Sequence, residues 1–449
     1  MDKFLKNSNI KNNQKNGIEL STTSEYVVDV FFSFDESKLS NIDTDSLIKL
    51  MWYYRDIRNN GKGRRDEFKL ILKEVLTRDV SLDLSNIVKY GRFKDIIDLL
   101  KDDSYASLHN DLLKVIKDNW DNNLLKKYLP QQSKDLAKLI IKAVYNIDGV
   151  IAPSIYKKYR KHKASYHTVE RQLTLKEKID FEKVPSVCMK IHGRPRKAFE
   201  NDFYSNDFHD YKNKLVTGEA KINTSAITPV DIYKEYKRGL MNAVLEAQLN
   251  QYKFEFDGDV LAVIDTSGSM EGDPENIARG LGVFLMRRNK GRFHNLSLIF
   301  AGEPQIYKIE DKDTYEEAWG NLPEIHELST QISKVFAMMQ ELAEDNANLP
   351  KAIVLFSDMQ FDSAYYGYTK TEYNKWKNIL KDQFPQIIFW NCNESINDSF
   401  PVKFDEKGTI LLGGNNPRIF FDVMDKINNG QDITPLSFVM DVLNQYPSR

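Results

Sequence analysis

Five short runs made mostly of apolar residues, all of them after Tyr252, place the strongest constraint on the fold of this chain. Each run is four or five residues long, and stretches with helical spacing, such as 275–287 and 329–342, lie between them. Runs without polar alternation predict strands buried on both faces, and their alternation with helices predicts a parallel sheet covered by helices. The runs are 260–264, 296–300, 352–356, 387–390 and 409–412.

Before residue 250 the apolar residues instead recur at steps of three and four, as in Leu47, Leu50, Met51 and Tyr54. Many such segments, separated by short polar breaks, predict helices that stack in a bundle or a HEAT-like solenoid. We therefore expect a multidomain chain. It has a flexible tail over 1–25, an α-helical repeat domain over 26–252, and an α/β doubly wound parallel-sheet domain over 253–449.

The composition narrows the class of protein. The hydrophobic fraction of 41% is enough to build cores, and the net charge of −2 gives no overall attraction to nucleic acid or membrane. Only two cysteines are present, which favours a reducing compartment. No run reaches 18 apolar residues and the N-terminus lacks an apolar signal core, so we expect an intracellular, cytoplasmic protein without a membrane segment.

Oxygen-bearing side chains follow two of the expected strands. Asp265 ends the first strand, Ser267 and Ser269 follow on its turn, and Asp358 follows the strand at 352–356. Ligands of open parallel sheets bind beyond the C-terminal ends of the strands. Carboxylates and hydroxyls without sulfur or imidazole suit Mg²⁺, or alternatively Mn²⁺ or Ca²⁺. Two carboxylates would leave positions on the ion for water or for an acidic group of a partner.

The run Asp265-Thr-Ser-Gly-Ser269 resembles the DxSxS motif of the metal-ion-dependent adhesion site of von Willebrand factor A domains. The resemblance implies that Ser267 and Ser269 bind the ion through their hydroxyls, and that Asp265 and Asp358 bind it directly or through water. Such sites add a threonine from a second loop, for which Thr330 is the candidate. This chain departs from the pattern at Gln331, where an acidic residue is expected. A von Willebrand A fold with an empty, degenerate site is the alternative.

An enzymatic role for the same loop would need further catalytic residues that the sequence does not supply, so no catalytic residue is assigned. An aspartate-nucleophile phosphatase needs a second acid two residues after Asp265, where Ser267 stands. A serine hydrolase elbow needs G-x-S-x-G, which residues 266–270 do not match. No histidine is placed by the sequence beside the loop. A metal-dependent hydrolase stays a remote alternative, because no base or nucleophile is evident.

The segment from residue 126 to residue 197 is strongly basic, with 18 Lys and Arg against 6 Asp and Glu. Cations neutralise phosphates, and the aromatic residues Tyr156, Tyr159, Tyr166 and Phe199 are interleaved with them and could stack on unpaired bases. The alternative is a solvated helix face with ordinary core aromatics. The candidate nucleic-acid contacts are Lys157, Lys158, Arg160, Lys161, Lys163, Arg194, Arg196 and Lys197.

Several spaced motifs resemble an uncharacterised family of plants, fungi and giant viruses, which joins a TROVE-like helical module to a C-terminal von Willebrand A domain. They include Tyr54-Arg-Asp-Ile-Arg-Asn-Asn-Gly-Lys-Gly-Arg-Arg65, Tyr90-Gly-Arg-Phe-Lys-Asp95 and the run from Phe181 to Lys190. The TROVE module is that of the Ro autoantigen, which binds small RNAs with its helices and carries a metal site in its A domain. The resemblance implies RNA binding at the level of the fold. It also implies a location in a virion or host cytoplasm if the chain is viral.

These observations lead to one hypothesis and one main alternative. The hypothesis is a non-enzymatic, monomeric RNA- or ribonucleoprotein-binding protein, whose A domain holds Mg²⁺ and binds a protein partner through an acidic residue. The RNA could be structured or single-stranded. The alternative is a protein-interaction scaffold that uses the metal site without binding nucleic acid.

Overall fold

The computed structural model divides the chain into two compact units. The first joins Met1–Leu50 to Ile227–Tyr446, and the second joins Met51–Ala226 to Pro447–Arg449. The predicted domains over 26–252 and 253–449 are a different division of the chain and stay predictions. The structure describes residues 10–13, 17–20, 23–59, 61–78, 80–201, 203–256, 258–300, 303–323, 332–344, 349–359, 374–393, 405–429, 431 and 433–448.

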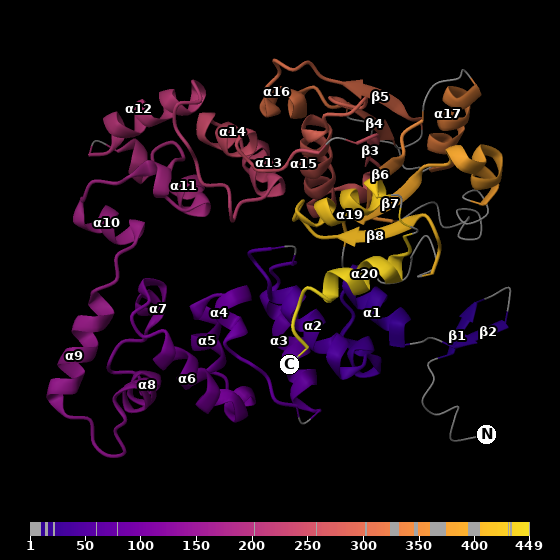
Figure 1. The fold of residues 1–449 in the computed structure, drawn as a ribbon. Helices are drawn as coiled ribbons and strands as arrows, with labels where there is room; N and C mark the ends of the chain where they lie inside the picture. The colour runs from indigo at the N-terminus through magenta and orange to yellow at the C-terminus, as the bar shows by residue number, and fades with distance from the viewer. Residues whose placement is uncertain are drawn as a thin grey trace, which may run out of the picture. The chain divides into compact units, whose positions relative to one another are not determined.

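A six-stranded sheet forms the centre of the first unit (Figure 1). Its strand order is β5-β4-β3-β6-β7-β8, and all neighbours are parallel except the edge strand β5, which runs antiparallel to β4. All five predicted strands are confirmed, and their buried faces explain their apolar runs. The strands are β3 (Val260–Asp265), β4 (Leu296–Phe300), β5 (Gln305–Lys308), β6 (Ala352–Ser357), β7 (Gln386–Asn391) and β8 (Thr409–Gly413).

Strand β5 was not predicted, and its position explains why. It lies at the edge of the sheet, where Gln305, Ile306 and Lys308 are exposed and only Tyr307 is buried. The Tyr307 hydroxyl donates a hydrogen bond to the Ala318 carbonyl at 2.6 Å. A four-residue strand with a single buried side chain carries no apolar run, so its sequence does not distinguish it from a loop.

Helices cover the sheet. Helix α15 packs on β3, β4 and β6, and α13 packs on α15 at Gly280, where a Cβ atom would lie 3.1 Å from the Val230 Cα. Helix α1 packs on α20 and β8, so the first described helix contacts the last one. The helices of this unit are α1 (Thr23–Phe32), α13 (Pro229–Lys237), α14 (Ala243–Asn250), α15 (Asp273–Arg288), α16 (Tyr315–Gly320), α17 (Ile332–Glu344), α19 (Ile419–Asn428) and α20 (Pro435–Leu443). The short strands β1 (Ile10–Asn13) and β2 (Gly17–Leu20) pair antiparallel.

The second unit is helical, as predicted. Several helices pack on the second helix after them in the chain. Thus α5 contacts α7, α6 contacts α8, and α7 contacts α9. The helices are α3 (Arg65–Leu76), α4 (Asn86–Tyr90), α5 (Phe93–Leu99), α6 (His109–Asp118), α7 (Asn123–Tyr128), α8 (Asp135–Tyr145), α9 (Pro153–Ala164), α10 (Val169–Leu175), α11 (Ser186–His192) and α12 (Ser205–Val216), and α2 (Thr44–Arg55) crosses the boundary between units. No helix in the described part of the chain is long and apolar enough to cross a membrane.

A buried ion pair joins the first helices of this unit. Arg55, at the end of α2, is 1% exposed and donates from Nε to Asp95 Oδ2 at 2.8 Å. The Arg65 Nε atom lies 3.1 Å from the other oxygen of Asp95. A Cβ atom on Gly91 would lie 2.7 Å from the Asp95 carboxylate, so glycine is required for this close approach. The motifs around Tyr54 and Tyr90 therefore build a structural contact between helices.

Candidate metal centre and basic helix face

The loop after β3 lies beside the loop after β6. The two strands are parallel neighbours with Ile264 opposite Phe356, so Asp265 and Ser357 end their strands at the same edge of the sheet. Asp358 follows Ser357 directly. The side chains of Asp265 and Asp358 are buried, each with 1% of its surface exposed. The structure thus brings the two predicted carboxylates to one edge.

The carboxylate of Asp265 is held at both oxygens. Oδ1 accepts the backbone N–H of Ser267 at 2.9 Å, and Oδ2 accepts the hydroxyl of Ser357 at 2.6 Å. The pKa of Asp265 is raised to about 6, mainly by burial and to a smaller extent by the nearby charge of Asp358, against the lowering effect of these hydrogen bonds. Burial and a like charge both disfavour the ionised form.

The two serine hydroxyls predicted to bind the ion lie together. Ser267 Oγ and Ser269 Oγ are 3.2 Å apart, with Ser267 buried and Ser269 exposed. Thr266, which precedes Ser267, is engaged with β4 instead, since its backbone N–H donates to the Phe300 carbonyl at 2.9 Å. Its hydroxyl also contacts that carbonyl, at 3.3 Å. The loop therefore brings the hydroxyls of Ser267 and Ser269 together, whereas the hydroxyl of Thr266 contacts β4.

Two further residues position the site, and the sequence did not single them out. Ser357 donates to Asp265 and also accepts the backbone N–H of Met359 at 3.1 Å. The backbone N–H of Asp358 donates to the sulfur of Met270 at 3.1 Å, which ties the loop after β6 to the loop after β3. The signal for Ser357 was its place directly before Asp358 at the end of a buried strand. A methionine acting as a hydrogen-bond acceptor has no sequence signal.

The donor set fits a hard divalent cation. Among the described residues, no Lys, Arg or His side chain is paired with Asp265, so a bound cation would offset a buried charge that the protein leaves uncompensated. No group of three or more His, Cys, Asp or Glu side chains within these residues could hold a metal ion. The ion would therefore depend on Ser267, Ser269 and water as well as on the two carboxylates. Thr330 lies outside the described residues.

The pKa of Asp265 gives a pH-dependent prediction for the metal-free protein. Its rise from 3.8 to about 6 means that folding favours the protonated acid, so the stability contributed by that form is lost as the pH rises through about 6. One pKa unit corresponds to about 1.4 kcal/mol. We expect Asp265→Asn to exceed the wild type in free energy of unfolding, with a difference that grows by about 1.5 kcal/mol between roughly pH 5 and pH 7.5.

Urea unfolding in EDTA at several pH values measures this difference. Asp259→Asn is the matched control. Asp259 lies just before the N-terminal end of β3, whereas Asp265 lies at its C-terminal end, and Asp259 is paired with Arg292. A difference for Asp265→Asn that does not change with pH would contradict the interpretation of Asp265 as an uncompensated buried carboxylate.

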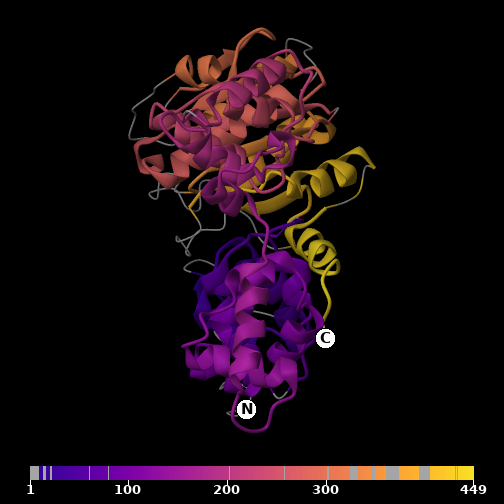
Figure 2. The same ribbon diagram turned by 90° about the vertical axis from the view of Figure 1, so that its left-hand side faces the viewer.

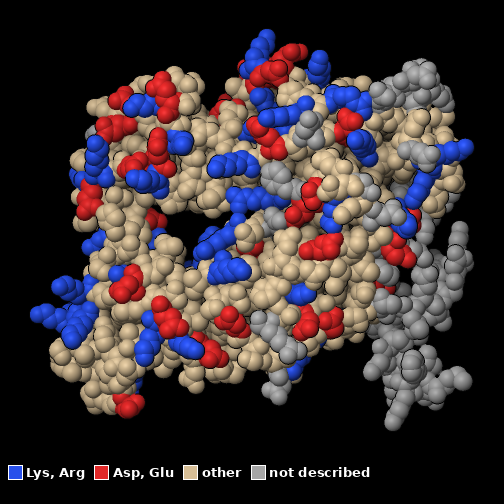
Figure 3. All heavy atoms as spheres, viewed as in Figure 1, with Lys and Arg blue, Asp and Glu red and all other residues tan. Residues whose placement is uncertain are grey.

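Five of the eight predicted nucleic-acid contacts lie on one helix, and four of these five are exposed. Lys157, Lys158, Arg160 and Lys161 are all exposed on α9. Figure 2 shows α9 facing the viewer, and Figure 3 shows a group of Lys and Arg side chains over it at the left edge of the view. These four residues form what we call the α9 basic face.

The other four predicted contacts lie outside this face, one of them on α9 and three in a separate segment. Lys163 is half-buried and donates to the Leu129 carbonyl, so its amine is engaged within the unit. Arg194, Arg196 and Lys197 lie in the separate segment after α11, where Arg194 is half-buried and the other two are exposed. The structure therefore gathers the four exposed cations of α9 into one face and leaves the other predicted contacts outside it.

Two of the interleaved aromatic residues belong to the core. Tyr159 is fully buried and donates its hydroxyl to the Pro130 carbonyl at 2.6 Å, and Phe199 is fully buried against Phe181. The prediction that these two rings could stack on unpaired bases is therefore wrong. Tyr156 and Tyr166 are half-buried, and the Arg171 guanidinium lies 5.2 Å from the Tyr166 ring centre.

Comparison with known proteins gives two matches. Residues 259–435, which span β3 to β8 and both loops of the candidate metal centre, match the model of a family described as a domain of unknown function, DUF7788. Over an alignment of 493 residues, the chain is 23% identical to an uncharacterised protein of Acanthamoeba polyphaga mimivirus, covering 95% of this chain and 83% of that protein. A viral relative fits the predicted occurrence of such chains in giant viruses.

Proposed function

We propose that this protein is a non-enzymatic RNA- or ribonucleoprotein-binding protein with two binding surfaces. Its sheet unit acts as a von Willebrand A-type domain that holds Mg²⁺ at an adhesion-type site and captures a partner. Its helical unit acts as a TROVE-like module. The observation that carries the proposal is the pair of buried carboxylates, Asp265 and Asp358, at the ends of neighbouring strands beside two serine hydroxyls.

The metal would serve as a bridge to the partner. Asp265, Ser267, Ser269 and Asp358 would bind the ion directly or through water, with Thr330 as a further candidate. When bound, the ion supplies a positive charge with exchangeable positions, and a carboxylate is the group that best completes such an oxygen shell. Ser269 is exposed, so the ion would be reachable from solvent. We therefore propose that the partner offers an Asp or Glu side chain.

A binding role accounts for the surroundings of the loop better than a hydrolytic one. The Ser267 hydroxyl contacts the Ser269 hydroxyl and the Asp265 carboxylate, and among the described residues it has no hydrogen bond to a histidine. His294 lies just before the N-terminal end of β4, whereas Asp265 lies at the C-terminal end of the parallel strand β3. The His294 ring is paired with Asp311 at 2.8 Å. His294 therefore cannot take a proton from Ser267.

The α9 basic face supports the nucleic-acid part of the proposal. Four exposed cations on one helix match an RNA backbone, and the burial of Tyr159 removes one of the rings that could stack on bases. Binding would then rest on phosphate contacts, which depend steeply on salt and weakly on sequence.

Charge reversal on α9 tests this part. The variant with Lys157→Glu and Lys161→Glu removes two phosphate contacts, so we expect the slope of log affinity against log salt to fall by about 1.4 for single-stranded RNA and by about 1.8 for a duplex. Filter binding of structured and single-stranded RNA over a salt series measures the slope. The matched control is Lys114→Glu with Lys117→Glu, a pair of exposed residues on α6.

The result also separates the two leading functions. If the wild type binds neither RNA at low salt, or if both double variants lose affinity equally, α9 is not the RNA surface. In that case the interaction scaffold remains, in which the metal centre alone captures a protein partner.

A further inference from the structure

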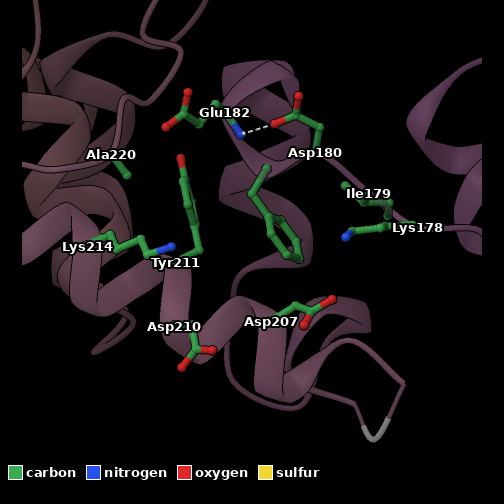
Figure 4. A pocket seen from close by; sticks show the side chains of 10 residues that line it. Lys178, Ile179, Asp180, Glu182, Asp207, Asp210, Tyr211, Lys214 and Ala220 are labelled. Atoms are coloured by element: carbon green, nitrogen blue, oxygen red, sulfur yellow. Dashed lines mark hydrogen bonds between the residues drawn. The ribbon is translucent and has the colours of Figure 1, made fainter.

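The helical unit contains a pocket that neither the metal centre nor the α9 basic face explains. It has a volume of about 670 Å³, within the size range of sites for small ligands. One wall is α12, and the other is the segment 178–182, with Ala220 between them (Figure 4). All of its lining residues belong to the second compact unit.

One face of α12 supplies the first wall. Asp207, Asp210, Tyr211 and Lys214 are spaced by three, one and three residues, so they lie along one side of the helix. Two carboxylates three residues apart on a helix repel each other. Asp207 and Asp210 are both exposed, and neither belongs to an ion pair among the described residues.

The opposite wall adds two more carboxylates. Asp180 lies 2.9 Å from the Lys183 amine and accepts the backbone N–H of Glu182 at 3.2 Å. Glu182 itself accepts the backbone N–H of Lys221 at 3.2 Å. The lining contains four carboxylates but only two lysines, Lys178 and Lys214, so it carries two more negative than positive groups. The pocket therefore has negative charge on both sides, and one of its walls belongs to the segment 126–197, which is basic as a whole.

Aromatic rings form a fixed floor. The rings of Phe181 and Tyr211 are stacked with centres 5.4 Å apart, and both side chains are buried. The Tyr211 hydroxyl donates to the Lys221 carbonyl at 2.8 Å. Burial raises the pKa of Tyr211 above its usual value, and the charges of Glu182 and Asp180 raise it further, so the hydroxyl stays neutral. Aromatic rings beside carboxylates are the surroundings that guanidinium and alkylammonium groups prefer.

The carboxylates are arranged for an extended cation and not for a metal ion. Asp207 and Asp210 stand across the pocket from Asp180 and Glu182 (Figure 4). Within the described residues, they do not form a group that could hold a metal ion. An organic cation can bridge separated carboxylates because its charge and its N–H donors are spread over several atoms.

We propose that this pocket binds an organic cation, either a polyamine or the guanidinium of an arginine side chain in a peptide. Both carry N–H donors for the carboxylates and an apolar or planar part for the aromatic floor. The proposal does not depend on the metal centre or on RNA binding by α9.

Isothermal titration of the full-length, nuclease-treated protein tests it, with spermidine and an arginine-containing tripeptide as the two probes. We expect at least one probe to bind, and its affinity to fall by about tenfold or more in the variant Asp207→Asn with Asp210→Asn. The control variant is Asp111→Asn with Asp118→Asn, two exposed acids on α6. It should bind with unchanged affinity.

The outcomes distinguish a polyamine ligand from a peptide ligand, and both from a failure of the proposal. Binding of spermidine alone identifies a polyamine site, and binding of the tripeptide alone identifies a peptide site. If neither probe binds, if both variants respond equally, or if inorganic phosphate, titrated separately, is the only compound that binds, the proposal is overturned. The last result would assign the pocket to Lys178 and Lys214 instead.

Discussion

Millimolar Mg²⁺ or Mn²⁺ should raise the melting temperature of the full-length protein, and Asp265→Ala should abolish the rise. An ion that binds only the native state, at about 100 times its Kd, stabilises it by about 2.7 kcal/mol. For a unit of this size, that corresponds to a shift of roughly 5–10 °C. Differential scanning calorimetry with and without the ion measures the shift.

The full chain is required for this experiment. Helix α13 packs on α15, and α1 packs on α20 and β8, so a fragment that begins near residue 253 would lack part of the first compact unit. Ser269→Ala provides a second test, since Ser269 is exposed and its loss should remove a ligand without unfolding the loop. Asp259→Ala, before β3 at the other edge of the sheet, should retain the full shift. An unchanged shift in both Asp265→Ala and Ser269→Ala would contradict the assignment of the site.

Asp95→Ala should destabilise the helical unit by about 3–5 kcal/mol, because it leaves the buried guanidinium of Arg55 without its carboxylate. Arg65 would lose its contact with Asp95 as well. Burial already lowers the pKa of Arg55, with Asp95 acting in the opposite direction. Urea unfolding followed by circular dichroism measures the loss.

Asp98→Ala is the control for this prediction, because Asp98 lies on the same helix and pairs with Lys94 nearer the surface. We expect it to cost about 1 kcal/mol or less. Equal losses for the two variants would show that the buried pair contributes no more than a surface pair.

The apolar runs were sufficient to predict five of the six strands of the sheet and the edge where Asp265 and Asp358 meet. A strand buried on both faces requires such a run, and the ends of parallel strands lie at one edge. The hydrogen bonds of Ser357 to Asp265 and of Asp358 to Met270 were not predictable, because they depend on the distance between two loops. The packing of α1 on α20 is likewise a contact between distant segments, which local periodicity does not encode.

The basic segment shows a different limit of sequence reasoning. Its net charge was counted along the chain, whereas the structure sorts the charges in space. Lys157 and Lys161 lie on α9, while Asp180 and Glu182 lie in the pocket beside α12. The aromatic residue Tyr159 has the same spacing whether it is exposed or buried, and only packing decides that it belongs to the core.

Direct counting of bound ions tests the metal centre most directly. Titration with Mn²⁺, with the free ion followed by electron paramagnetic resonance, gives the number bound per chain. The account predicts one ion per chain for the wild type and for Asp259→Ala, and none for the variant with Ser267→Ala and Ser269→Ala. A wild type that binds no ion, or a double serine variant that still binds one, would contradict it.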